Sequence, residues 1–191
     1  MVMVMAIGVL ALQGDFEEHL AVLQKLAIEG KEVRSLDDLA CVDRLILPGG
    51  ESTAIGSLLV VTGLGSAIVK RVKRGTLTIL GTCAGAILLA KRVQGGLPPG
   101  ALALMDMTIE RNAYGRQVQS FRAELTLDGV PAAHSGVFIR APKINQVGSG
   151  VQVLAQHQGA PVLVREGRMF AATFHPEVEG DTWLHERFLS I

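Results

Sequence analysis

The segment at residues 81–85 reads Gly-Thr-Cys-Ala-Gly, and it restricts the possible folds of this chain more than any other feature. An apolar, strand-like run at 77–80 precedes it, and a helical run at 86–92 follows it. A strand, a tight turn with a reactive residue at its apex and a helix form a nucleophile elbow, here with sulfur in place of a serine oxygen. Glycine is needed on both sides, because side chains at 81 and 85 would clash where the turn brings the backbone together. The segment therefore predicts an α/β chain with Cys83 as the nucleophile.

A second segment, Phe174-His175-Pro176-Glu177, supplies a base and a carboxylate two residues apart. In an extended segment these two side chains point the same way, so Glu177 can hold the tautomer of His175. Pro176 between them restricts the backbone. An imidazole beside the elbow favours the thiolate form of Cys83 and can later protonate a leaving amine. Cys83, His175 and Glu177 are therefore a candidate catalytic triad.

Acyl transfer also needs N–H donors for a developing oxyanion. The backbone N–H of Ala84, directly after the nucleophile, is one source. The loop at 48–52, Pro-Gly-Gly-Glu-Ser, is another, because glycine lets a backbone N–H approach a substrate oxygen. Each of these signals is weak or moderate alone, and a loop of this composition is more often a plain turn. Their joint occurrence at strand ends of an α/β chain favours catalysis.

Composition limits the kinds of partner. The 191 residues suit one domain, 1–191, and 49% hydrophobic residues suffice for a large core. Lys+Arg and Asp+Glu are equal at 18 each, which argues against nucleic acid or an anionic membrane as the main partner. The apolar N-terminus lacks a basic flank and is too short for a membrane span, so we expect a buried first strand rather than a signal peptide.

The chain has two cysteines, Cys41 and Cys83, which do not make a disulfide framework. We therefore expect reduced thiols and a cytoplasmic location. Cys41 lies in an apolar patch and is expected to be a small buried hydrophobe. His19, His134, His157 and His185 have no partner pattern and are expected to be solvated or to lie at the edge of the core.

Hydrophobic periodicity divides the chain into two halves. The first half alternates predicted strands at 5–12, 31–36, 44–47 and 76–80 with predicted helices at 15–29, 52–61, 65–74 and 86–92. This alternation predicts a parallel sheet that is covered on both faces. The second half is predicted to add strands at 107–109, 117–127, 137–140, 151–156, 161–165 and 169–174, and a last helix at 181–189. Turns between several of these strands indicate a partly antiparallel addition to the sheet.

The first predicted helix, 15–29, carries two local signals. Phe16, Leu20, Leu23 and Ala27 would form its buried face, and Asp15 with Glu18 resembles a capping box.

Together these residues resemble a known family. The elbow with His175-Pro176-Glu177 resembles class I, triad-type glutamine amidotransferases. Further segments, at 8–14, 47–53, 110–117, 120–121 and 136–142, are similar to the glutaminase-subunit family of pyridoxal 5'-phosphate synthases. The elbow alone indicates only the superfamily, whereas the segments after residue 109 indicate the subunit. The resemblance runs nearly end to end, and it implies a flavodoxin-like three-layer sandwich with a mostly parallel central sheet and an added antiparallel portion.

The resemblance implies a division of labour between two proteins. This subunit would hydrolyse L-glutamine to glutamate and ammonia, and a separate barrel-shaped synthase subunit would use the ammonia to build pyridoxal 5'-phosphate. The glutaminase would be weak alone and activated on docking, within a large hetero-oligomer. The resemblance implies no cofactor on this subunit, and no cluster with metal-ligand spacing is visible in the sequence.

Site residues transfer from the family one by one. Cys83, His175 and Glu177 match the triad. The matches to its glutamine-binding residues are Gly49, Gly50, Glu51, Arg111, Ile139 and Arg140. Glutamine is a zwitterion, so its α-carboxylate needs cations or N–H donors. Without the resemblance, Arg111 and Arg140 would be interpreted as surface ion pairs. Gly50 with Ala84 is the expected oxyanion hole, although Gly49 could supply the peptide instead, and Gln13 matches a residue near that loop.

Three other interpretations remain open at this stage. The chain could supply ammonia to another pathway, which the elbow does not exclude but the segment at 110–121 disfavours. It could be a different cysteine-elbow enzyme, such as a peptidase, although those typically place His directly after the cysteine and position 84 is Ala. It could also be a silent regulatory domain, against which the intact triad argues.

Overall fold

The computed structural model describes residues 6–111, 113, 120–127, 134–180 and 182–191. Several sequence-based predictions therefore lie outside the described residues. They are the start of the first strand at Met5, the start of the strand predicted from Gln117, most of the 110–117 segment, the turns at Tyr114-Gly115 and Asp128-Gly129, and the helix start at Asp181.

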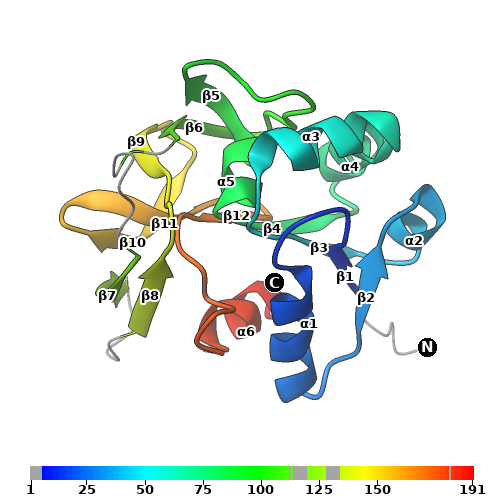
Figure 1. Ribbon diagram of the computed structural model, residues 1–191, viewed down its shortest axis with the longest axis horizontal. Helices are drawn as coiled ribbons and strands as arrows, with labels where there is room; N and C mark the ends of the chain where they lie inside the picture. Colours follow the sequence, from blue (N-terminus) through cyan, green and yellow to red (C-terminus); the bar gives the residue numbers. More distant parts are fainter. Residues whose placement is uncertain (1–5, 112, 114–119, 128–133, 181) are drawn as a thin grey trace.

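The large sheet of the described chain combines a parallel and an antiparallel part (Figure 1). Its parallel strands, in spatial order, are β2 (Gly30–Val33), β1 (Ile7–Leu10), β3 (Arg44–Leu47), β4 (Thr78–Thr82) and β12 (Met169–Ala172). The antiparallel part continues from β12 with β11 (Ala160–Glu166), β10 (Gln152–His157), β7 (Phe121–Leu127) and β8 (His134–Phe138). The predicted α/β fold, with a mostly parallel sheet and an added antiparallel portion, is confirmed.

Alternation along the buried strands divides the core into two layers. Leu45 and Ile79 face one hydrophobic cluster, whereas their neighbours Ile46 and Leu80 face the other. The first cluster is covered by α2 (Leu36–Ala40), α3 (Ser52–Val61), α4 (Leu64–Lys73) and α5 (Ala84–Leu89), and the second by α1 (Phe16–Lys25) and α6 (Trp183–Leu189). Figure 1 shows α1 and α6 on the opposite side of the sheet from α3 and α5, which makes the three-layer sandwich.

A smaller sheet was not predicted in full. It contains β5 (Ala90–Gln94), β6 (Met105–Glu110) and β9 (Lys143–Val147). The helix after the elbow, predicted to reach Arg92, ends at Leu89, and the chain passes directly into β5. Strand β9 has no counterpart in the sequence analysis, because its alternation is interrupted by polar residues and only Ile144 is buried.

Two predictions at helix starts are wrong. The strand predicted to reach Leu36 ends at Val33, because Ser35 and Asp38 form a capping box that begins α2. Asp15 precedes α1 without a side-chain capping bond, because its carboxylate lies near His175 instead. Of the residues expected on the buried face of α1, Leu23 is buried and Phe16 and Leu20 are partly buried against the second cluster, whereas Ala27 is exposed. His19 and Val22 complete the buried stripe.

The structure also corrects three burial predictions. Cys41 is exposed, because it lies at the C-terminal cap of α2. His19 and His185 are fully buried, whereas His134 and His157 are partly exposed, as expected for the edge of the core.

The described helices include none that alone is long and apolar enough to cross a membrane. In the described part of the chain, α3 and α4 together have suitable length and composition, and they are bent by 89° at their junction.

The order of the strands indicates where on the sheet a functional site is expected. Strand β1 has β2 on one side and β3 on the other, so the connections diverge at this point. In open α/β sheets, ligands bind at the carboxyl ends of strands beside such a switch point. The segments that follow β1, β3, β4 and β12 therefore meet at one edge of the sheet.

Candidate active site

The elbow places Cys83 in a conformation that few residues adopt. Its φ is 47° and its ψ is −101°, and the side chain is almost buried. A Cβ on Gly81 would lie 2.7 Å from the backbone carbon of Gly85, and a Cβ on Gly85 would lie 2.1 Å from the carbonyl oxygen of Leu47. The close approach expected at both glycines is therefore present, and it holds the thiol at the end of β4.

His175 and Glu177 form a buried pair. Nδ1 of His175 lies 2.7 Å from Oε1 of Glu177, and the backbone N–H of His175 donates to the carbonyl of Val137 at 2.8 Å. Glu177 lies in a turn, and not in the extended segment that was expected, but its carboxylate still reaches the ring. Burial lowers the pKa of His175, but interactions with Cys83 and Glu177 outweigh burial and raise the pKa to about 10. The pair therefore favours an imidazolium beside the thiol.

The absence of a side chain at Gly49 leaves room for the ring of His175. A Cβ at this position would lie 2.5 Å from Cε1 of His175 and 2.8 Å from Oδ2 of Asp15. The carbonyl of Gly49 accepts a hydrogen bond from the backbone N–H of Asp15 at 3.2 Å. The loops after β1 and β3 thus pack together around the ring of His175.

Asp15, His175 and Glu177 present possible ligand atoms within 4.8 Å of one another. Oδ2 of Asp15 lies 3.7 Å from Nδ1 of His175, and the same nitrogen is at hydrogen-bond distance from Glu177. A nitrogen that donates to a carboxylate cannot also bind a metal ion. The geometry is therefore that of an oriented base.

The loop at 49–51 is held by the loop after β1. Gly50 has a φ of 139°, a backbone conformation that favours glycine. The backbone N–H of Glu51 donates to Oε1 of Gln13 at 2.9 Å. Gln13 therefore fixes the peptide next to the expected oxyanion residue Gly50. The oxyanion role of Gly50 and Ala84 stays a prediction.

A cavity of about 170 Å³ opens beside the nucleophile. Its lining residues are Gly50, Glu51, Ser52, Cys83, Ile87, Arg111 and Arg140. Pockets for drug-sized ligands begin at about 300 Å³, so this cavity suits a smaller molecule. Of the other residues predicted to bind glutamine, Ile139 directs its carbonyl oxygen at Sγ of Cys83, 3.9 Å away, and Gly49 lies against His175.

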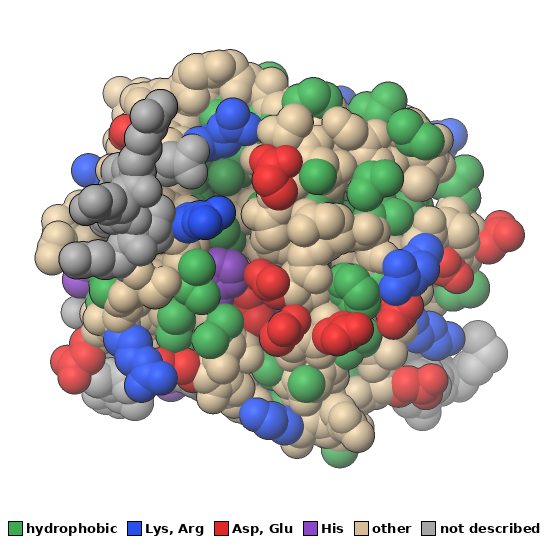
Figure 2. Space-filling view, in the orientation of Figure 1, with side chains coloured by type: hydrophobic (Ala, Val, Ile, Leu, Met, Phe, Trp, Pro, Cys, Tyr) green, Lys and Arg blue, Asp and Glu red, His purple; other side chains and the backbone are tan. Residues whose placement is uncertain are grey.

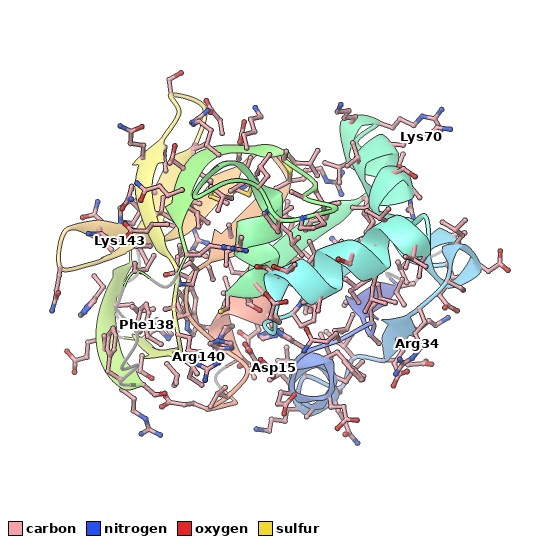
Figure 3. The ribbon with its side chains drawn as sticks, turned by 45° about the horizontal axis from the view of Figure 1, so that its top comes forward. Asp15, Arg34, Lys70, Phe138, Arg140 and Lys143 are labelled. Atoms are coloured by element: carbon pink, nitrogen blue, oxygen red, sulfur yellow. The ribbon has the colours of Figure 1, made fainter. Side chains whose placement is uncertain are left out.

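The charged residues of the cavity differ in how they are engaged. The carboxylate of Glu51 accepts the backbone N–H groups of Thr53 and Ala54 at 3.0 and 2.8 Å, so it caps α3. Arg111 lies 3.4 Å from the hydroxyl oxygens of Ser52 and Thr53. Among the described residues, no carboxylate lies within ion-pair distance of Arg111 or Arg140, although the charge of Arg111 helps to lower the pKa of Glu51. Both guanidinium groups line the cavity, where they could meet an anion. Figure 3 shows Arg140 and Asp15 on the same side of the molecule.

Figure 2 shows the surface around this region. Acidic side chains gather in front of α1, and basic side chains lie toward the β-rich half of the molecule.

The sequence analysis missed several residues that the fold brings to this region: Asp15, His19, Ser52, Thr82 and Ile87. Of these, His19 had a usable signal. It lies three and four residues before the apolar Val22 and Leu23, which places it on the buried stripe of α1. A histidine on a buried stripe requires a partner, and this one lies beside the triad.

The fold is that of a glutamine amidotransferase, and Cys83, His175 and Glu177 lie where the expected triad of that class would be. The chain belongs to the SNO glutamine amidotransferase family, whose sequence pattern matches residues 9–190.

Comparison with known proteins agrees with this membership. The chain is 51% identical over 185 residues to a pyridoxal 5'-phosphate synthase subunit PdxT of Thermus thermophilus, covering 97% of this chain and 96% of that protein. It is 50% identical over 193 residues to the subunit of the same name from Chloroflexus aurantiacus, covering 98% and 100%. A crystal structure of a glutamine amidotransferase superposes with a TM-score of 0.93 at 49% identity, covering 97% of each chain. The structure of PurLQS from Thermotoga maritima, at 17% identity and a TM-score of 0.72, covers 97% of each chain and shares the fold.

Proposed function

We propose that this chain is the glutaminase subunit of a pyridoxal 5'-phosphate synthase, with Cys83, His175 and Glu177 as its triad. The observation that carries the proposal is the small cavity that joins Cys83 to Arg111 and Arg140, next to the buried His175–Glu177 pair. The full-length similarity to subunits named PdxT supports the pathway.

The first half of the reaction forms a thioester. The thiolate of Cys83 attacks the carboxamide carbon of glutamine, and the carbonyl oxygen becomes an oxyanion. The N–H groups of Gly50 and Ala84 are the proposed donors to that oxygen. The imidazolium of His175 then gives its proton to the nitrogen, the C–N bond breaks, and ammonia leaves.

The second half resolves the thioester with water. His175, now neutral, takes a proton from the water molecule as the hydroxyl attacks the thioester carbon. The C–S bond breaks, glutamate leaves, and the proton returns the Cys83–His175 pair to its starting state. Glu177 keeps Nδ1 of His175 as a donor throughout, so Nε2 is the atom that exchanges protons.

The cavity suits the rest of the substrate. Arg111 and Arg140 are proposed to bind the α-carboxylate of glutamine, because guanidinium groups pair with carboxylates through two hydrogen bonds. The α-ammonium group needs acceptors, and the backbone carbonyl of Ile139 lies beside the thiol. Gly49 and Glu51 are proposed to shape the cavity from the opposite loop. We also propose a cytoplasmic location, because the mechanism requires a reduced thiol and both cysteines are free.

The first test is glutamate release from L-glutamine, with and without the cognate synthase subunit, in the parent and in Cys83→Ala. We expect release that rises on addition of the synthase and is absent in the variant, while the variant still binds the synthase. Docking should survive because the substitution removes one nearly buried sulfur.

Other results would change the assignment. Activity that is indifferent to the synthase would favour a glutaminase of another pathway. If neither condition releases glutamate, the proposed reaction is wrong and a regulatory role is favoured.

A further inference from the structure

Behind the triad, the described chain buries two histidines that the reaction does not use. His19 of α1 and His185 of α6 are fully buried. Nδ1 of His19 lies 2.9 Å from Nε2 of His185, and Nε2 of His19 lies 3.1 Å from Oγ1 of Thr82, the residue before the nucleophile. The same Nε2 lies 3.5 Å from Oε2 of Glu177. His19 therefore connects both helices of one layer to the carboxylate of the triad.

The two oxygens of Glu177 have different surroundings. Oε1 is 2.7 Å from Nδ1 of His175. Oε2 is buried and, among the described residues, accepts no hydrogen bond of good geometry. The nitrogen that approaches it is Nε2 of His19. A buried carboxylate needs compensation at each oxygen, so this contact matters for the energy of the site.

The protonation of His19 follows from its neighbours. Burial lowers its pKa well below the usual value, and the charges of His185 and His175 lower it further. Near neutral pH the ring therefore carries one proton. A carboxylate only accepts hydrogen bonds, so the proton belongs on Nε2, which faces Glu177 and Thr82. Nδ1 is then the acceptor, and Nε2–H of His185 donates to it.

We propose that His19 is a positioning residue of the triad: its Nε2–H, bonded to Thr82, lies 3.5 Å from Oε2 of Glu177, attracts that oxygen electrostatically and so keeps Oε1 on Nδ1 of His175. Without this contact the carboxylate is free to rotate about its last bond, and His175 loses its fixed tautomer. The inference rests on the proposed glutaminase function, because it assigns a further residue to the same site.

Two amide substitutions separate this role from simple packing. In His19→Gln the side-chain amide can place an N–H near the position of Nε2. In His19→Asn the shorter side chain places it near Nδ1, toward His185. Both variants are polar and smaller than histidine, so they differ mainly in the donor that faces Glu177. His157→Gln is the control, because His157 is partly exposed and contacts the rings of Phe121 and Phe138.

The kinetic experiment measures kcat and KM for glutamine in the complex with the synthase, across pH. We expect His19→Asn to lower kcat by about 10- to 100-fold, the usual effect of losing a partner that orients a reactive group. KM should change little, because His19 does not line the cavity. His19→Gln should recover most of kcat, and His157→Gln should match the parent.

The alkaline limb of the pH profile gives a readout that packing alone would not move. In the parent this limb reports loss of the proton from His175, whose pKa is about 10. A loosened Glu177 stabilises the imidazolium less, so the limb should move to lower pH in His19→Asn and stay in place in His19→Gln. The charged and titratable groups that act on His19 are Glu177 and His175 from the turn after β12 and His185 from α6. Asp15, at the start of α1, lies 3.7 Å from Nδ1 of His175.

A second readout does not depend on the substrate. The rate of alkylation of Cys83 by iodoacetamide, followed across pH, reports the same pairing of thiol and imidazole. Cys41 is exposed, so this experiment uses Cys41→Ser in every chain. If His19→Asn does not fold, His19→Met takes its place, with similar bulk and no N–H.

The outcomes are distinguishable. An alkaline limb that moves in His19→Asn but not in His19→Gln supports the inference. Equal losses of kcat in both variants with unmoved limbs, or no loss in either, would overturn it. If the parent releases no glutamate, the proposed function is wrong, and the alkylation profiles still decide whether His19 controls the Cys83–His175 pair.

Discussion

At the scale of single residues, Gly49 is a position where adding one methyl group would push against the ring of His175. A Cβ there would lie 2.5 Å from Cε1 of His175. Because the ring is buried and bonded to Glu177, it must shift to make room. A shift of about 1 Å at a catalytic group can cost about 100-fold in rate, so we expect Gly49→Ala to lower kcat by about that factor. Steady-state glutaminase assays with the synthase present measure it.

The matched control is Gly150→Ala. A Cβ at Gly150 would have no atom within 4 Å, so the same change of side chain meets open space. We expect parental kcat and a parental melting temperature. A Gly49→Ala enzyme with full kcat would show that the base tolerates displacement, contrary to the close packing in this loop.

The sequence predicts the triad residues because each lies in a short motif with its own chemistry. Cys83 follows a strand, and His175 and Glu177 are near neighbours, so the motif specifies their pairing. His19 could not be assigned in the same way, since its contacts with Thr82 and Glu177 depend on how α1 packs under the sheet. The family resemblance likewise selects Glu51 but does not reveal that its carboxylate caps α3.

At the scale of elements, Glu51 has two structural roles: it stabilises the start of α3 and it forms part of the cavity wall. Its carboxylate accepts two backbone N–H groups at the start of α3 and lines the cavity as well. Loss of a capping side chain costs about 1 kcal/mol, so we expect Glu51→Ala to lower the free energy of unfolding by about that amount and to raise KM for glutamine. Urea unfolding and steady-state kinetics measure the two effects.

The cap also predicts a pH dependence. Hydrogen bonds from the backbone N–H groups of Thr53 and Ala54 lower the pKa of Glu51 below its usual 4.5, although partial burial opposes them. A lowered pKa in the folded state means that the stabilisation is present above pH 4.5 and is lost as pH falls further. The difference in unfolding free energy between the parent and Glu51→Ala should therefore shrink in acid.

Ser35→Ala is the matched control for this pair of effects. Ser35 caps α2, away from the cavity, so its loss should destabilise the chain by a similar amount and leave KM unchanged. If KM is unchanged in Glu51→Ala, Glu51 caps α3 but does not contribute to glutamine binding.

Elements with strong local signals were predicted well. Helix α3 has the predicted bounds, Ser52–Val61, because Glu51 caps it and Thr62-Gly63 ends it. Strands β5 and β9 were not predicted, because their pairing with β6 comes from tertiary contacts and not from periodicity. Polar residues interrupt both strands, so neither alternates over its full length.

At the scale of the whole molecule, the sequence predicts the class of fold but not the order of its strands. Strand β12 pairs in parallel with β4, with Ala172 opposite Thr82, and this pairing brings His175 to Cys83. Alternation of strands and helices indicates a parallel sheet, but it does not say which later strand joins its edge. The position of the base relative to the nucleophile therefore emerges only from the assembled sheet.

Arg44 links strand β3 to the C-terminal end of helix α6. It lies at the start of β3, is almost fully buried, and pairs with Asp43 at 3.5 Å. Its Nη2 donates to the carbonyl of Leu189 at 3.4 Å and also to the carbonyl of Ile191. The last carbonyls of a helix have no partner within the helix, so Arg44 supplies donors for the end of α6.

Replacement of Arg44 by methionine keeps much of the bulk and removes these donors. We expect Arg44→Met to lower the free energy of unfolding by about 1–3 kcal/mol, because buried carbonyls and the charge of Asp43 lose their partner. Arg74→Met, at the exposed cap of α4, should stay within about 0.5 kcal/mol of the parent.

Hydrogen exchange locates the effect of Arg44→Met. Amides at the end of α6, such as that of Ser190, which donates to the carbonyl of Glu186 at 3.0 Å, should exchange faster than in the parent, whereas those of α3 should change less. Because α6 also carries His185, a looser α6 should weaken the support of His19 and so reduce kcat before the chain unfolds. Parental exchange in α6 together with a lower unfolding free energy would place the role of Arg44 in β3 and not in docking of the last helix.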